Sequence, residues 1–178
     1  MNKPILAFIA SLATALAMPV HAAKTTGDHL DDGAIAASIK AGLLDNKDTS
    51  SMSINVESYK GTVQLSGFVD SQTEKDAAGK VAGGVDGVKK VINSLSIAPK
   101  TSMGTKLDDT VMTSKVKAAL MDDAEVKSGQ INVETKNGVT QLAGFVTNEA
   151  MKERAGKVAA GVSGVKTLEN VLVVKPKE

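Results

Sequence analysis

The sequence predicts an α+β protein built from two tandem copies of one small module, each with the element order α-β-β-α-β. The main observation is an internal repeat. Residues 54–93 align without a gap with residues 131–170, 77 positions later, and 22 of the 40 aligned pairs are identical. Within each copy the apolar residues change from helical spacing to strand alternation and back. A complete unit that returns at a fixed period indicates duplicated domains. We therefore expect two similar surfaces rather than one catalytic cleft.

Each copy is expected to open with a helix. Asp31-Asp32 and Asp108-Asp109 provide carboxylates that can accept hydrogen bonds from the free N–H groups of a first helical turn. Apolar residues follow at helical spacing, namely Ile35, Ile39 and Leu43 in the first copy and Met112, Val116 and Leu120 in the second. The polar segments 45–51 and 122–129 are expected to end these helices.

A β-hairpin is expected next. Asn137-Gly138 is a strong signal for a tight turn, and Lys60-Gly61 stands in the equivalent place. Along the returning strand, successive side chains point to opposite faces of the sheet. Val63, Leu65, Gly67 and Val69 form the apolar face, and Thr62, Gln64, Ser66 and Phe68 form the opposite one. Gly67 and Gly144 are expected to let a helix approach the apolar face closely.

The second helix and third strand complete the module. Ser71 to Glu74 has the capping-box pattern and Asn148 starts the counterpart helix. The third strand follows the segments 84–87 and 161–164, and a strand–helix–strand crossover makes it parallel to its neighbour. The expected fold is a three-stranded mixed sheet with both helices on one face.

The sequence also predicts how the chain is divided into segments. Residues 1–22 have a positive start, an apolar stretch and small residues before a cleavage point, as in a signal peptide. A transmembrane anchor is the alternative, but the stretch is short for a bilayer and is interrupted by Ser11, Thr14 and Pro19. The expected divisions are a lead-in over 23–29, domain 1 over 30–98, a linker over 99–106, domain 2 over 107–175 and a tail over 176–178.

Charge and composition exclude several classes of function. The chain contains no cysteine, which excludes disulfides, thiol chemistry and a lipid-anchored cysteine. Without Lys3, which the expected cleavage removes, basic and acidic side chains are equal in number. A nucleic-acid binder needs an excess of positive charge, so no nucleic-acid partner is expected.

The repeated pattern resembles the BON-domain family. Val/Thr-x-Leu-x-Gly-x-Val, a helix, Gly-Val-x-Gly-Val and Val/Leu-x-Asn-x-Leu occur in both copies, with Asn93 and Leu95 ending the first. The fold signature includes Gly67, Gly84, Gly87, Gly144, Gly161 and Gly164. The resemblance implies a stress-induced bacterial envelope protein that associates with phospholipid or helps exported proteins in a chaperone-like way. Lipoprotein relatives carry an anchoring cysteine, which this chain lacks, so membrane residence is not implied.

No catalytic residues, cofactor or metal site are expected. His29 stands outside the repeats in a polar lead-in, where a solvated side chain is the ordinary outcome. The acidic loop residues lack the ligand order of a calcium loop. Gly84 to Gly87 and Gly161 to Gly164 spell the G-x-x-G of nucleic-acid-binding KH domains, but they precede a strand in a neutral chain. We interpret them as tight helix-to-strand turns.

Two sets of residues are candidates for binding. The first is a group of repeated lysines that could contact anionic lipid headgroups: Lys75, Lys80, Lys89, Lys152, Lys157 and Lys166. The second is Phe68 and Phe145, which alternation places on the sheet face away from the helices. A sheet with helices on one side leaves its other face open, and we expect the other sheet or nearby loops to cover these residues within one chain. The alternative is that they stay exposed and capture a client polypeptide or a second copy of the chain, so that changing both residues to serine would leave the fold intact but weaken capture.

The sequence therefore predicts a non-catalytic periplasmic protein of the osmotic or envelope stress response. Its expected partners are unfolded or exported polypeptides. The alternative partner is an anionic phospholipid surface, on which the protein would act as an adaptor that stabilises the membrane. Weak self-association is a further expectation.

Overall fold

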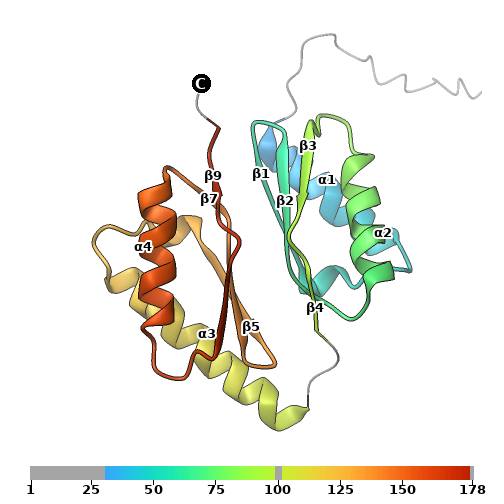
Figure 1. Cartoon of the computed structure of the whole chain (residues 1–178). Coiled ribbons are helices and arrows are strands. Elements are labelled where there is room, and N and C mark those ends of the chain that lie inside the picture. Colours follow the sequence, from blue (N-terminus) through green and yellow to red (C-terminus); the bar gives the residue numbers. More distant parts are fainter. Residues whose placement is uncertain (1–30, 99–101, 177–178) are drawn as a thin grey trace, which may run out of the picture.

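The computed structural model describes residues 31–98 and 102–176, which form two α/β domains packed sheet to sheet (Figure 1). Helices cover the outer face of each sheet, so the order of layers is helices, sheet, sheet, helices. The predicted signal peptide, the lead-in with His29 and the last two residues of the tail lie outside the described residues.

Both domains have the predicted order of elements, and the α+β class with two tandem modules is confirmed. Domain 1 contains α1 (Asp32–Asp45), the 3-10 turn η1 (Ser51–Ser53), β1 (Ile54–Tyr59), β2 (Thr62–Val69), α2 (Gln72–Gly83), β3 (Lys90–Asn93) and β4 (Ser96–Ile97). Domain 2 contains α3 (Met103–Asp122), η2 (Ser128–Gln130), β5 (Asn132–Lys136), β6 (Val139–Ala143), β7 (Phe145–Val146), α4 (Glu149–Ala160), β8 (Thr167–Asn170) and β9 (Val173–Val174).

Each sheet is mixed, as the connections predict. β1 pairs antiparallel with β2, with Tyr59 opposite Thr62 across the hairpin turn. β3 and β4 both pair parallel with β2, and together they correspond to the predicted third strand. In domain 2, β6 and β7 likewise continue one another and pair with β8 and β9. The interruption of the last strand coincides with a repeated asparagine, Asn93 or Asn170.

That asparagine joins the strand to the second helix. Asn93 Nδ2 donates to the Lys75 carbonyl oxygen at 2.8 Å, and Asn170 Nδ2 donates to the Lys152 carbonyl oxygen at 2.9 Å. The amide side chain satisfies a helix carbonyl and draws the strand out of regular pairing, which explains why the motif carries Asn in both copies.

The hydrophobic core of each domain lies between its helices and the outer, helix-facing side of its own sheet (Figure 1). In domain 1 it contains the predicted helix residues Ile35, Ile39 and Leu43 together with Val63 and Leu65 from β2. Domain 2 repeats this arrangement with Val116, Leu120, Val133, Leu142, Ala155 and Ala159. The helical spacing and strand alternation therefore predicted the cores correctly.

The predicted start of the helix in domain 2 is wrong. α3 begins at Met103, not at Asp108-Asp109, and Ser102 Oγ accepts from the Thr105 N–H as its N-cap. Residues 103–106 of the predicted linker are therefore helical. Serine is among the best N-cap residues, and nothing between Ser102 and Asp108 stops a helix. In domain 1 the predicted cap, Asp31, is confirmed.

Asp32 and Asp109 hold the hairpin turn instead. The Asp32 carboxylate accepts from the backbone N–H groups of Lys60 and Gly61 at 2.6 and 2.9 Å. The Asp109 carboxylate accepts from those of Asn137 and Gly138 at 2.8 and 2.9 Å. Burial favours a raised pKa for Asp32, but the hydrogen bonds from Gly61, Ser58 and Lys60 and the charge of Lys89 lower the pKa overall. Each domain thus locks its first helix to its hairpin with a carboxylate.

The predicted reason for glycine at Gly67 and Gly144, the close approach of a helix, is also wrong. A Cβ on Gly67 would collide with the Ser53 carbonyl oxygen, and a Cβ on Gly144 with that of Gln130; neither would first meet a helix. Their φ angles are +109° and +124°, where side chains are strongly disfavoured. The glycines are required because the strand twists beside the backbone that enters the hairpin. Gly87 and Gly164 also have positive φ, whereas Gly84 and Gly161 end helices with ordinary αR geometry.

Candidate functional site

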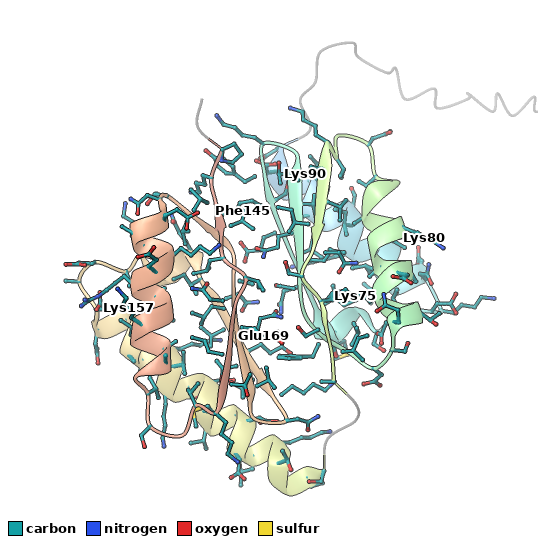
Figure 2. The ribbon with its side chains drawn as sticks, viewed as in Figure 1. Lys75, Lys80, Lys90, Phe145, Lys157 and Glu169 are labelled. Carbon is teal, nitrogen blue, oxygen red and sulfur yellow. The ribbon has the colours of Figure 1, made fainter. Side chains whose placement is uncertain are left out.

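The sheet faces opposite the helices are not open. Phe68 is 1% exposed and Phe145 is 5% exposed. Figure 2 shows Phe145 in the layer between the two domains, and its ring lies 5.8 Å from that of Tyr59 in domain 1. Coverage by the other sheet within one chain, the expected outcome, is therefore what the structure shows, and the alternative of an exposed face is wrong. Changing both Phe residues to serine would remove buried apolar area, so the expectation that the fold survives this change no longer holds.

Two buried glutamines join the sheets by reciprocal hydrogen bonds. Gln64 Oε1 accepts from the Gly144 N–H at 2.8 Å, and Gln141 Oε1 accepts from the Gly67 N–H at 2.7 Å. Gln64 Nε2 donates to the Val171 carbonyl oxygen at 2.7 Å, and Gln141 Nε2 lies 3.1 Å from the Ser94 carbonyl oxygen. Each contact maps onto the other by the 77-residue offset. The two domains are therefore related by an approximate two-fold axis through this interface.

A partly buried carboxylate, Glu134, lies beside this glutamine pair. Glu134 Oε2 accepts from Asn55 Nδ2 across the interface at 3.0 Å. Burial raises the pKa of Glu134, although the Asn55 hydrogen bond and the charges of Lys136 and Lys117 oppose this effect. Burial likewise raises the pKa of Glu57, the equivalent residue of domain 1, against the charge of Lys40. Both carboxylates thus lose solvation when the domains pair.

Glu134→Gln is expected to raise the urea midpoint at pH 7.5. Because the pKa of Glu134 is raised on folding, the folded chain binds more protons than the unfolded chain between the two pKa values, and stability falls as pH rises through that window. Glutamine removes the buried charge and still accepts from Asn55. The gain should disappear below about pH 4, where the carboxyl is protonated in both states. Glu153→Gln, an exposed change on α4, is the control. A less stable Glu134→Gln protein at pH 7.5 would contradict this prediction.

The predicted lysines lie on the outer surface and do not form one patch. Figure 2 shows Lys80 on α2 and Lys157 on α4 pointing away from each other on opposite outer sides of the molecule. Lys75 and Lys152 are partly buried at the start of the same two helices. A single flat surface therefore cannot engage both helices together. Each domain would have to bind such a surface separately.

The lysines after the second helices lie near acidic residues. Lys89 contributes a positive charge close enough to lower the pKa of Asp32. Lys166 borders a small cavity that is also lined by Asp108 and Asp109. Both lysines are exposed, but these carboxylates reduce the positive potential that an anionic headgroup would meet.

The sequence interpretation missed an exposed apolar stripe on α3. Met103, Leu107 and Val111 are exposed at a spacing of four residues, and Met121 continues the same side of the helix. This side is opposite to the one that buries Val116 and Leu120. The signal was present as a second set of apolar residues at helical spacing. Met103 and Leu107 were overlooked because the helix was expected to begin after Leu107.

A pocket of about 260 Å³ adjoins this stripe at Met121, towards the C-terminal end of α3. It lies between the C-terminal half of α3 and the start of β5 and is lined by Leu120, Met121, Ile131 and Val133, with Lys117, Ser128 and Gly129 at its margin. A volume of this size accommodates one large apolar side chain. The stripe and pocket, which we call the α3 surface (Met103, Leu107, Val111, Met121 and this pocket), form an apolar surface on domain 2.

The described residues contain no cluster of acidic, histidine or cysteine side chains arranged to hold a metal. Asp123, in one of the acidic loops, forms an ion pair with Arg154 at 2.7 Å. Within residues 31–98 and 102–176, no helix has both the length and the apolar character needed to cross a membrane.

Comparisons with known proteins agree with the repeated architecture. The family model described as "BON domain" matches residues 31–99 and 108–176. Osmotically-inducible protein Y of Escherichia coli (strain K12) is 42% identical over 151 residues, which cover 84% of this chain and 75% of that protein. Outer membrane lipoprotein DolP of Haemophilus influenzae is 33% identical over 149 residues, which cover 83% of this chain and 77% of that protein. The two matched domains, the shared fold elements and these relatives lead to one conclusion: this chain belongs to the BON-domain family.

Proposed function

We propose that this chain is a non-catalytic periplasmic protein of the osmotic or envelope stress response that binds unfolded or exported polypeptides through the α3 surface. The exposed apolar stripe of α3 is the observation that carries this proposal. An exposed row of Met, Leu and Val beside an apolar pocket is suited to apolar side chains of a partner. The similarity to a protein named as osmotically inducible supports the stress role.

The charge of α3 favours a polypeptide over an anionic bilayer. The helix carries Lys106, Lys115 and Lys117 against Asp108, Asp109 and Asp122, so its side chains have no net charge. Helices that lie on anionic membranes usually combine an apolar face with excess Lys and Arg. Contact between the α3 surface and a client should therefore depend on apolar area and persist at moderate salt.

The polypeptide proposal predicts that Leu107→Gln combined with Val111→Gln abolishes most of the protection of an aggregating client. Glutamine keeps helix propensity while removing exposed apolar area, so the urea midpoint should stay unchanged. The measurement is light scattering of a reduced, unfolded client without lipid. Leu44→Gln is the matched control, because Leu44 on α1 is 70% exposed and Leu107 is 69% exposed. Full protection by the α3 variant would reject the proposed surface.

A phospholipid-surface adaptor is the second candidate. The outward lysines of α2 and α4 favour it, and one relative is named as an outer membrane lipoprotein. Because Lys80 and Lys157 point to opposite sides, one domain would bind the surface at a time. Flotation with vesicles that contain or lack phosphatidylglycerol distinguishes the candidates. Loss of flotation in a variant that carries Lys75→Gln, Lys80→Gln, Lys152→Gln and Lys157→Gln, with client protection intact, would favour the adaptor.

A further inference from the structure

The domain interface has a symmetric part and an asymmetric part. The glutamine contacts are the same in both directions, so they would form between any two copies of the module. Other contacts differ because the two copies carry different residues. The Ser96 hydroxyl donates to Glu169 Oε2, which also accepts from Gln141 Nε2. The two-fold axis maps this pair onto Val173 and Ile92, which are both apolar and partly buried.

A second pair differs in the same way. Lys136 Nζ lies 3.4 Å from Asp70 Oδ1 across the interface. The 77-residue offset maps these residues onto Tyr59 and Thr147, which carry no charge. Tyr59 contacts the Phe145 ring instead. At both places, a polar or charged residue of one domain gains a partner on the other domain that a like domain would not provide.

Pairing of like domains would lose these complements. In a pair of two domain 2 faces, Glu169 would lie against Val173 and Lys136 against Thr147. In a pair of two domain 1 faces, Ile92 would lie against Ser96 and Tyr59 against Asp70. In a pair of two domain 2 faces, Glu169 would keep Gln141 Nε2 of its own domain but would lose the Ser96 hydroxyl and lie against an apolar side chain, so the carboxylate would have fewer donors than in the native pair. Mismatched polar groups therefore destabilise pairs of like domains, whereas the glutamine contacts are equally favourable in like and unlike pairs.

We propose that Ser96 with Glu169 and Asp70 with Lys136 form a pairing code, by which each sheet face binds the unlike domain and rejects its own kind. The partner of this surface is the other domain of the same chain. When chains associate through it, the partner is the unlike domain of a second copy. The inference is independent of the proposed client binding, which uses the opposite side of domain 2.

A transposition of the code in the full chain tests this inference. Ile92→Glu with Ser96→Val gives domain 1 the residues of domain 2, so both carboxylates face valine. Adding Glu169→Ile and Val173→Ser moves the matched pair to the other side of the two-fold axis and restores complementarity. The readouts are amide exchange of Gly67 and Gly144, whose N–H groups donate across the interface, and the radius of gyration from solution scattering.

The mismatched variant should show at least a roughly tenfold faster exchange of both glycine amides, with a larger radius of gyration or new dimers. The transposed variant should return both readouts close to the original protein. Native-like exchange in the mismatched variant would overturn the inference. Amides of Ile39 and Val116 report whether each domain core is intact. If the mismatch also exposes these cores, recovery in the transposed variant still supports the code, and failure to recover overturns it.

Discussion

Replacing Gly144 with alanine is expected to lower the free energy of unfolding by about 3 kcal/mol or more. Gly144 has a φ of +124°, and a Cβ there would collide with the Gln130 carbonyl oxygen, which belongs to backbone and cannot rotate away. Relief would require the strand to move, and that would displace the N–H that donates to Gln64 across the interface. Urea unfolding of the full chain measures the loss.

Gly129→Ala is the matched control for this change. Gly129 also lies in domain 2, close to the same strand, but nothing lies within 4 Å of the position of an added Cβ. Its φ is not in the positive range, so alanine should change the free energy of unfolding by less than about 0.5 kcal/mol. Equal effects of the two substitutions would show that backbone geometry at Gly144 is not the cause.

Gln141→Ala is expected to cost about 2–4 kcal/mol of stability. The change leaves the buried Gly67 N–H without its acceptor and opens a cavity between the sheets. Gln141 Nε2 also donates to both Glu169 Oε2 and Ser96 Oγ. Without it, the half-buried Glu169 carboxylate loses a donor that compensates for its lost solvation. The domains should separate more often, and the Gly67 amide should exchange faster while the amides of the domain 1 core keep their protection.

Gln72→Ala provides the comparison for Gln141. Gln72 is exposed at the start of α2, and its Nε2 donates only within the helix, to Asp76. A loss of no more than about 0.5 kcal/mol is expected. If Gln141→Ala were as mild as this, the reciprocal glutamines would align the domains without contributing much to their association.

The elements that were correctly predicted are those whose evidence lies within a few residues. Ile35, Ile39 and Leu43 recur at the helical period because they face one core, and Ser71 and Asn148 cap the helices that follow them. The helix start at Asp108 was wrong because two plausible caps compete there, and the carboxylate of Asp109 is used by the hairpin. The local sequence pattern does not distinguish a carboxylate that caps a helix from one that accepts hydrogen bonds from a distant turn.

The candidate site was predicted less well, for a related reason. The alternation placed Phe68 and Phe145 on the correct face, but the exposure of that face depends on what packs against it. The lysines were found as repeated residues, yet their separation onto opposite sides follows from the two-fold pairing. The α3 surface was missed in part because Met103 and Leu107 belong to the first turns of α3, which have no counterpart in domain 1.

The amino-acid sequence by itself determined the module, its duplication and the residues of the helices and strands that face each core, because these follow from the period of the backbone. Only the tertiary structure decided that a face carrying Gln64, Ser66 and their counterparts is buried. When one strand is considered alone, polar side chains on a face predict that this face is exposed to solvent. Here the hydrogen-bonding partners of Gln64 and Gln141 lie in the other copy of the module and become neighbours only when the two sheets meet.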